Sequence, residues 1–340
     1  MSLLEIADLS IHIRGGRRLV EGVSLSVEPG EIVGVAGESG SGKTVTAMTS
    51  LGFLPAGATA TGEVRLNGAD VLSMTPKQLQ TIRGTEVAMV FQDPMTSLHP
   101  MLNIGTQLTE HLRVHKGLGR KAAWARAAEL LDMVRLPDPN SALSAFPHRF
   151  SGGMRQRIAI AMALACDPKL LIADEITTAL DVTVQAGILD LLDRLRRDTG
   201  MAVVFITHDL AVMNVVADRL YVMYGGRMAE SGSISQVLNF TRHPYTRALI
   251  DALPEGAVLG KALVPIPGEA ATPDRRPSGC AFNPRCSFAI DSCQTEVPQL
   301  RELEIGHSAA CAVDPFGDQP DGAQRRSIAL STRKDPHVAS

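Results

Sequence analysis

The sequence predicts an α/β fold built on a parallel sheet that is covered on both faces. Short, continuous apolar runs are typical of such buried strands, and they lie at Val33–Ala36, Val87–Phe91, Leu170–Ala173 and Val203–Ile206. Helical patterns separate these runs along the chain, as an α/β core requires. The third observation is a glycine-rich loop between the first apolar run and a helical segment. This order is typical of a phosphate-binding site.

The glycine-rich loop fits the pattern G-x-x-x-x-G-K-[ST]. It consists of Gly37, Glu38, Ser39, Gly40, Ser41, Gly42, Lys43 and Thr44. Its glycines let backbone N–H groups point at a phosphate, and the helix that follows adds its positive dipole end. We expect Lys43 to reach the β- and γ-phosphates and the Thr44 hydroxyl to hold Mg²⁺. The alternative is a Gly/Ser-rich surface turn, which the flanking strand and helix disfavour. The loop therefore predicts a P-loop NTPase with a RecA-like parallel core.

Further elements surround this core. Residues 3–13 and 19–28 alternate apolar and polar, and Thr61–Leu66 ends in an Asn-Gly turn, so we expect an antiparallel β-subdomain. A helical insert precedes the Leu170 strand. Its apolar face on residues 122–134 includes Trp124, which we expect in the core. A second helix is expected to begin at an Asp181 cap.

Two acidic residues end the Leu170 strand. A carboxylate at the carboxyl edge of a sheet, beside a phosphate loop, suits control of Mg²⁺, and we assign this role to Asp174. Glu175 follows it, points elsewhere, and could polarise the attacking water as general base. The alternative is an ordinary strand end with solvated acids. The P-loop favours the catalytic interpretation.

A second anion-binding pattern lies at Ser151-Gly152-Gly153, directly before a helical run. Backbone N–H groups and the helix dipole favour an anion there. Arg155 and Arg157 oppose the dipole in the first turn. We therefore expect them to pair with acidic groups.

Composition bounds the function. The chain has 340 residues and a formal net charge of −3, so no nucleic-acid partner is implied. The N-terminus lacks the basic and apolar regions of a secretory signal, and no stretch is long enough to span a membrane. We expect a cytoplasmic or peripheral protein.

Taken together, these motifs resemble the ATP-binding cassette (ABC) ATPases over residues 3–235, and most closely the ATP-binding subunits of oligopeptide and dipeptide importers. The resemblance rests on residues 91–98, the signature at 150–157, residues 178–183 and the segment at 243–247. The sequence departs from the family at Ile176, where proline is usual, at Ile13, where an aromatic stacks on adenine, and at His99, where Asn is common.

The resemblance implies roles for single residues. Gln92 would sense Mg²⁺ and the γ-phosphate and relay to the membrane partner, and His208 would orient the attacking water. Asp181 would bridge two nucleotide-binding halves. Ser151, Gly152 and Gly153 would clamp the γ-phosphate of ATP held by the opposite subunit, so hydrolysis would need a dimer.

Cysteines crowd into the C-terminal extension. Of five cysteines, Cys280, Cys286, Cys293 and Cys311 lie there with the spacing C-x5-C-x6-C-x17-C. Disulfides are disfavoured in a reducing cytoplasm, and zinc modules usually show closer pairs. Four thiolates also suit an iron–sulfur cluster, which the resemblance implies as [4Fe–4S]. Zinc and free buried thiols stay open as alternatives. Cys166 is expected in the core.

We therefore predict the ATP-hydrolysing subunit of a bacterial peptide importer, peripheral on the cytoplasmic face of the inner membrane. Its expected partners are a second ATPase subunit in a heterodimer, two permeases and, indirectly, a solute-binding protein. Another small solute (a nickel chelate, glutathione or an opine) is an alternative. So is a soluble cassette protein acting on nucleic acid or the ribosome. The predicted domains are residues 1–235, with a helical subdomain at about 93–165, an extension at 236–314 and a disordered tail at 315–340.

Overall fold

The computed structural model describes residues 2–93, 97–178, 180–253 and 265–317. Its main sheet has eight strands in the order β11-β12-β10-β9-β3-β8-β7-β6. The five strands β9, β3, β8, β7 and β6 run parallel. They span Arg219–Tyr224 (β9), Ile32–Ala36 (β3), Ala202–Thr207 (β8), Leu170–Asp174 (β7) and Val87–Val90 (β6). The predicted α/β fold with a parallel core is confirmed.

A separate antiparallel sheet forms the β-subdomain, in the order β2-β1-β4-β5. Its strands are Leu4–Ile13 (β1), Arg17–Val27 (β2), Ala58–Leu66 (β4) and Ala69–Asp70 (β5). Asn67 and Gly68 have φ angles of 50° and 81° and form the tight turn between β4 and β5. The predicted antiparallel β-subdomain is therefore present.

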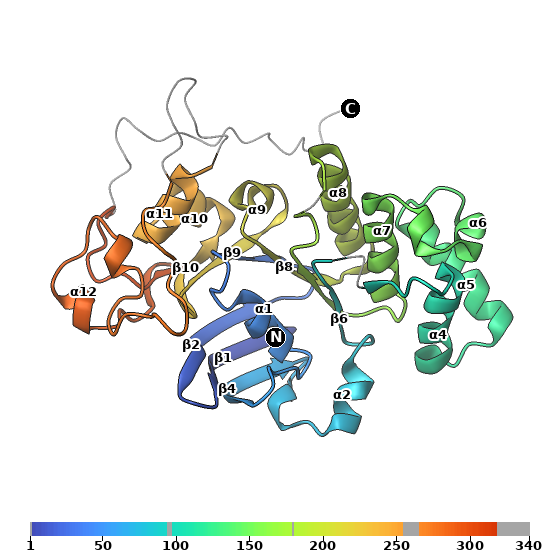
Figure 1. The fold of residues 1–340 in the computed structure, drawn as a ribbon, viewed down its shortest axis with the longest axis horizontal. Coiled ribbons are helices and arrows are strands. Elements are labelled where there is room, and N and C mark those ends of the chain that lie inside the picture. The colour runs from blue at the N-terminus through green and yellow to red at the C-terminus, as the bar shows by residue number, and fades with distance from the viewer. Residues whose placement is uncertain (1, 94–96, 179, 254–264, 318–340) are drawn as a thin grey trace.

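Helices make up much of the rest of the described chain (Figure 1). The P-loop helix α1 spans Lys43–Thr49, and α2 spans Pro76–Ile82. The helical insert contains α4 (Ile104–Lys116), α5 (Arg120–Met133), α6 (Pro139–Ser144) and α7 (Gly152–Ala163). After it come α8 (Val182–Thr199), α9 (Leu210–Val216), α10 (Ile234–Asn239), α11 (Pro244–Asp251) and α12 (Ser292–Thr295). Short 3₁₀ turns are η1 (Val71–Ser73), η2 (Pro147–Arg149) and η4 (Asn283–Arg285).

The parallel sheet separates two apolar cores. Along β7, Leu171 and Ala173 pack with the helices of the insert and with α8 and α9. The alternate residues Leu170 and Ile172 pack with the β-subdomain. Successive side chains of a strand point to opposite faces. Both faces of the central strands are therefore covered, which explains their continuous apolar sequences.

Two sequence-based expectations about packing are wrong. The C-terminal extension adds sheet, because β12 (His307–Ala309) pairs with β10 (Arg227–Ser233) and β11 (Arg301–Glu304) pairs with β12. The prediction that this extension adds no further sheet rests on its prolines, which lie before these short strands at positions 244, 254, 265, 267, 273 and 277. Trp124 is 39% exposed, because the buried face of α5 is formed by Ala123, Ala127, Leu130 and Leu131 and Trp124 lies beside it. The end of its ring lies close to Gly105 of α4.

The remaining expectations concern the membrane and the tail. Among the described residues, no helix is both long enough and apolar enough to cross a membrane. Most of the predicted disordered tail, residues 318–340, lies outside the described residues.

Candidate nucleotide site

The P-loop joins β3 to α1, so the strand–loop–helix order that the sequence predicted is present. Gly42 precedes α1 with φ 97°, a left-handed conformation that favours glycine. At Gly37, φ is 146° and an added Cβ would lie 2.1 Å from the carbonyl oxygen of Met223 in β9. The loop therefore needs glycine at both positions to follow this path.

Polar groups of the loop have the arrangement expected of a phosphate site. The Lys43 ammonium donates to the carbonyl oxygens of Gly37 and Glu38 at 2.7 and 3.0 Å. Burial lowers the pKa of Lys43, and the nearby carboxylates of Glu175, Asp174 and Glu38 act in the opposite direction. The Ser41 hydroxyl is buried and has no hydrogen-bond partner among the described residues. Such an orphaned donor inside a glycine loop fits a phosphate oxygen.

The residues assigned to Mg²⁺ lie together. The Thr44 hydroxyl donates to Asp174 Oδ1 at 3.1 Å. Asp174 ends β7 and is 6% exposed, and this burial raises the pKa of its carboxyl, with the Glu175 charge adding to the effect. Oxygen ligands of this kind suit Mg²⁺. The pair fits the metal that a P-loop NTPase uses, and Mg²⁺ would supply neutralisation of the phosphate charge.

The structure brings Glu175, Gln92 and His208 together beside the P-loop. Gln92 follows β6, and its amide donates to Glu175 Oε2 at 3.0 Å. His208 follows β8, and its Nδ1 lies 3.5 Å from Glu175 Oε1. Because the three carboxyl ends of β6, β7 and β8 meet at one edge, these side chains converge. Residues 94–96 of the motif after Gln92 lie outside the described residues.

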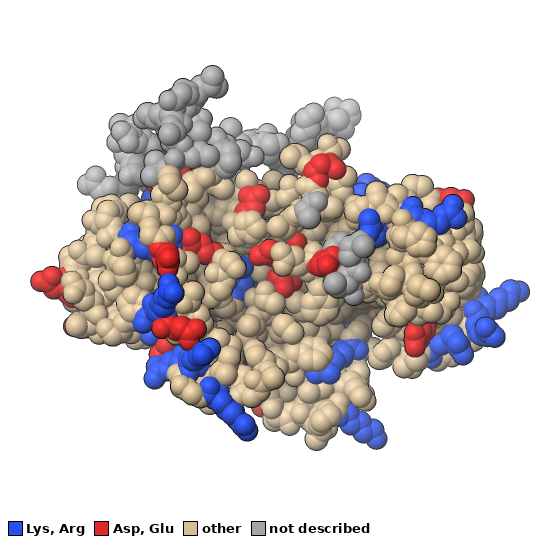
Figure 2. Space-filling view, viewed as in Figure 1, with Lys and Arg blue, Asp and Glu red and all other residues tan. Residues whose placement is uncertain are grey.

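Acidic side chains gather over the middle of the face drawn in Figure 2. A nucleoside triphosphate would bring further negative charge to such a surface. The Lys43 ammonium, the backbone N–H groups of the P-loop and Mg²⁺ are the groups available to offset it.

The predicted signature lies at the start of α7, well apart from α1 in Figure 1. Ser151 caps the helix by accepting a hydrogen bond from Met154 N at 3.3 Å. Ser151 and Gly152 are exposed, while Gly153 is buried against Val184 of α8. Asp181 caps α8 by accepting from Val184 N at 2.9 Å, as expected of a cap. An exposed Ser-Gly pair at a helix start is available to a second molecule.

Arg157 contacts the backbone of the neighbouring helices. Its guanidinium donates to the backbone oxygens of Val134 and Gly187 at 2.8 and 3.4 Å. The hydrogen-bond partners of Arg157 are thus carbonyl oxygens at the end of α5 and within α8, and the Asp190 carboxylate is the acidic group that acts on its charge.

Sequence reasoning missed two residues that touch the P-loop from the C-terminal part of the chain. Tyr245 of α11 accepts a hydrogen bond from Glu38 N at 2.7 Å. Arg285 of η4 pairs with the Glu38 carboxylate through both of its terminal nitrogens, at 2.6 and 3.0 Å. Tyr245 lies within the segment at 243–247 that supported the resemblance, but nothing in the sequence indicates that it packs on the loop.

The predicted iron–sulfur cluster is wrong. Among the described residues, which include Cys280, Cys286, Cys293 and Cys311, no group of three or more His, Cys, Asp or Glu residues is arranged to hold a metal ion. The same finding leaves no site for zinc. All four cysteines are free, but only Cys293 is buried, so the alternative of free buried thiols holds in part. Burial raises the pKa of Cys280 and raises that of Cys286 to about 11, and the neighbouring cysteines act in the same direction. Cys166 is buried, as predicted.

The fold and the loop define a P-loop NTPase. Family comparison extends this conclusion. Residues 20–178 match the ABC transporter family, and residues 229–293 match the oligopeptide/dipeptide transporter C-terminal region. The dipeptide transport ATP-binding protein DppD of Escherichia coli is 45% identical over 315 residues, which cover 92% of this chain and 96% of DppD.

Other similarities agree with this match. A putative peptide import ATP-binding protein of Brucella melitensis is 46% identical, and the alignment covers 91% of this chain and 94% of that protein. Among solved structures, the dimeric ATP-binding cassette MJ0796 bound to ADP and Pi superposes with a TM-score of 0.60 at 27% identity. The superposition covers 68% of this chain and 98% of that cassette. The chain therefore belongs to the ABC transporter family, and it is an ATPase of that family.

These comparisons also correct the predicted heterodimer. The matched family and the name of the E. coli relative describe one ATP-binding chain and supply no second, different one. The prediction of a heterodimer is not supported.

Proposed function

We propose that this chain binds and hydrolyses ATP to power a bacterial importer of dipeptides or oligopeptides. One observation carries the proposal: the similarity to a dipeptide transport protein runs through the C-terminal region as well as the cassette. That region is not part of the residues matched by the general ABC transporter model. The likeness therefore includes the part of the chain that distinguishes peptide transporters.

The roles of single residues in this proposal follow from their positions. Lys43, Ser39–Gly42 and Thr44 would hold the phosphates, with Asp174 and Gln92 completing the environment of Mg²⁺. Glu175 would take a proton from the attacking water. His208, whose ring lies 3.5 Å from the Glu175 carboxylate, would hold that water and the γ-phosphate in line.

We infer that the working unit contains two cassettes. The P-loop leads into α1 and the signature, of which Ser151 and Gly152 are exposed, begins α7. These two helices lie apart in Figure 1, which supports a site shared between two molecules. The solved cassette MJ0796 was described as a dimer. In the pair, the signature of one subunit would close the site of the other, and Asp181 would lie at the junction.

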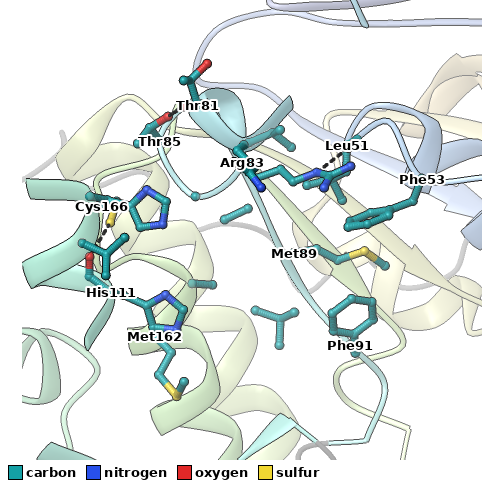
Figure 3. Close-up of a pocket in the computed structure, with 18 of the residues that line it drawn as sticks. Leu51, Phe53, Thr81, Arg83, Thr85, Met89, Phe91, His111, Met162 and Cys166 are labelled. Carbon is teal, nitrogen blue, oxygen red and sulfur yellow. Dashed lines mark hydrogen bonds between the residues drawn. The ribbon is translucent and has the colours of Figure 1, made fainter. Parts of the chain in front are cut away.

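The permease partners would bind in a groove of about 1200 Å³ between the core and the helical insert (Figure 3). Phe53, Met89 and Phe91 line one side, and His111, Met162 and Cys166 line the other. Phe91 is 45% exposed and directly precedes Gln92. An apolar groove of this kind fits a partner segment, and the neighbouring Gln92 would connect it to Glu175. The chain would thus lie at the cytoplasmic face of the inner membrane, below a solute-binding protein on the other side.

Copurification tests this function. We expect the tagged chain to retain two hydrophobic permease subunits in detergent, and peptide with its binding protein to raise ATP turnover of the complex. Phe91→Asp should abolish copurification and leave ATP binding intact. Retention of the permeases with stimulation only by a nickel chelate, glutathione or an opine would reassign the solute. Recovery of ribosomes or nucleic acid in place of permeases would contradict the proposal.

A further inference from the structure

The C-terminal part of the chain holds the P-loop directly. Arg285 and Glu38 are 247 positions apart in the sequence, yet their side chains form a two-pronged ion pair. The Arg285 side chain is 4% exposed and that of Glu38 is 27% exposed. A paired guanidinium and carboxylate in this geometry fix direction as well as distance. The pair is therefore a defined connection between η4 and the nucleotide loop.

Contacts other than the ion pair with Glu38 also hold the Arg285 side chain in place. Its Nε donates to Pro267 O at 2.7 Å, and its Nη1 donates to the Tyr224 hydroxyl at 3.1 Å. The rings of Tyr224, Tyr245 and Phe282 pack against one another, with centroids 4.4 to 5.3 Å apart. The same cluster supplies the Tyr245 hydroxyl that accepts from Glu38 N. Glu38 is thus held by both its main chain and its carboxylate.

The charge of Glu38 matters because of where it lies. Glu38 is a member of the phosphate loop, between Gly37 and Ser39, and its carbonyl oxygen accepts from the Lys43 ammonium at 3.0 Å. An uncompensated carboxylate there would repel the triphosphate and compete for Lys43. A partly buried carboxylate is screened less by solvent than an exposed one. Arg285 compensates this charge and keeps the carboxylate directed toward η4.

We propose that Arg285 is a positioning residue that neutralises Glu38 and thereby sets the affinity of the P-loop for the phosphates of ATP. The proposal rests on ATP binding, which belongs to the proposed function. It gives the C-terminal part of the chain a role in the nucleotide site that does not involve a metal. In this role Arg285 acts through Glu38 and does not touch the nucleotide.

Calorimetric titration with a non-hydrolysable ATP analogue and Mg²⁺ tests the proposal. Arg285→Gln should weaken binding about tenfold, because it leaves the Glu38 charge beside the phosphates. Glu38→Gln alone should bind at least as tightly as the wild type. The double variant R285Q/E38Q should return to within about twofold of the wild type. A merely structural role for Arg285 would give no such rescue.

A matched control is Arg242→Gln. The Arg242 side chain is 3% exposed and pairs with Glu304 and Asp314, both in the C-terminal part of the chain. This variant should lower the melting temperature without changing affinity for the analogue. If R285Q does not fold, the affinities of R285K and R285K/E38Q for the analogue are compared in the same way. We expect about a threefold loss in R285K, because lysine keeps the charge but not the fork, and recovery in the double variant.

The outcomes separate this inference from the function on which it rests. Wild-type affinity in R285Q, or equal weakening in R285Q and R285Q/E38Q, would overturn the inference alone. Weaker binding by E38Q than by the wild type would also contradict it. Failure of the wild-type chain to bind the analogue would overturn the proposed function as well.

Discussion

At the scale of single residues, Glu175 has an unusual backbone conformation. Its φ is 48°, a left-handed conformation that is uncommon for residues other than glycine. Such a conformation costs on the order of 1–3 kcal/mol and persists where the surroundings impose it. The Glu175 N–H donates to Ile206 O at 2.9 Å, and the next residue, Ile176, is 2% exposed. Burial of Ile176 thus anchors the turn at the position where the resemblance led us to expect proline.

The first prediction concerns Glu175→Gln. The amide keeps the shape of the side chain and its contact with Gln92 but cannot accept a proton from water. We expect ATP binding within about twofold of the wild type and turnover reduced by about 10²–10⁴-fold. Phosphate release and analogue titration measure the two quantities. Glu129→Gln, on the exposed side of α5, is the control and should retain full turnover. Unchanged turnover in Glu175→Gln would exclude Glu175 as the general base.

At the scale of elements, local patterns were enough to place most helices and strands. Four buried strands, the P-loop helix and the Asp181 cap follow from residues close together in the sequence. Contacts over long separations were not predictable in this way. The pairing of β12 with β10, and of Arg285 with Glu38, depends on how the C-terminal part folds back. Cysteine spacing misled for the same reason, because spacing does not fix how four thiols are arranged or how deeply they are buried.

The second prediction concerns pH and the start of α11. His243 caps this helix by accepting from Tyr245 N at 3.0 Å, and burial lowers its pKa from 6.5 to about 4. A lowered folded-state pKa means that the unfolded chain binds the proton first. The contribution of His243 to the free energy of unfolding is therefore fully present above pH 6.5 and decreases as the pH drops toward 4. Urea unfolding measures this effect. Between pH 7 and pH 5, the free energy of unfolding of the wild type should fall by about 2 kcal/mol more than that of His243→Asn.

Asparagine is the matched replacement because it can still cap the helix. Any other groups that titrate in this interval contribute to both proteins and cancel in the difference. Parallel pH profiles for wild type and His243→Asn would show that His243 is protonated as readily in the folded state as in the unfolded one.

The third prediction concerns the contact between α7 and α8. A Cβ at Gly153 would lie 2.4 Å from Val184 Cγ1. Gly153→Ala should therefore shift the start of α7 and reduce turnover about tenfold or more, while the P-loop of the same chain still binds ATP. Val184→Ala in that background should restore space and most of the turnover. If Gly153→Ala has wild-type turnover, the position of α7 is not critical to the signature.

At the scale of the whole molecule, the sheet divides the chain into two functional sides. The β-subdomain and P-loop lie with one core, and the helical insert with the signature lies with the other. The sequence motifs alone indicated both phosphate-binding patterns. Their places at the starts of α1 and α7, which lie apart in Figure 1, support the proposal that one chain does not combine them. Pairing of two chains is the arrangement that would use both.

The last prediction tests this pairing by mixing two inactive variants. Lys43→Ala removes the lysine of the P-loop but keeps the signature, and Ser151→Arg blocks the signature but keeps the P-loop. Each alone should lack turnover. In a 1:1 mixture, half of the pairs are mixed, and each mixed pair has one intact composite site. Turnover should therefore recover to about a quarter of the wild type. Turnover by Ser151→Arg alone would show that one chain hydrolyses ATP without its partner, whereas an inactive mixture would show that the two patterns do not meet across a pair.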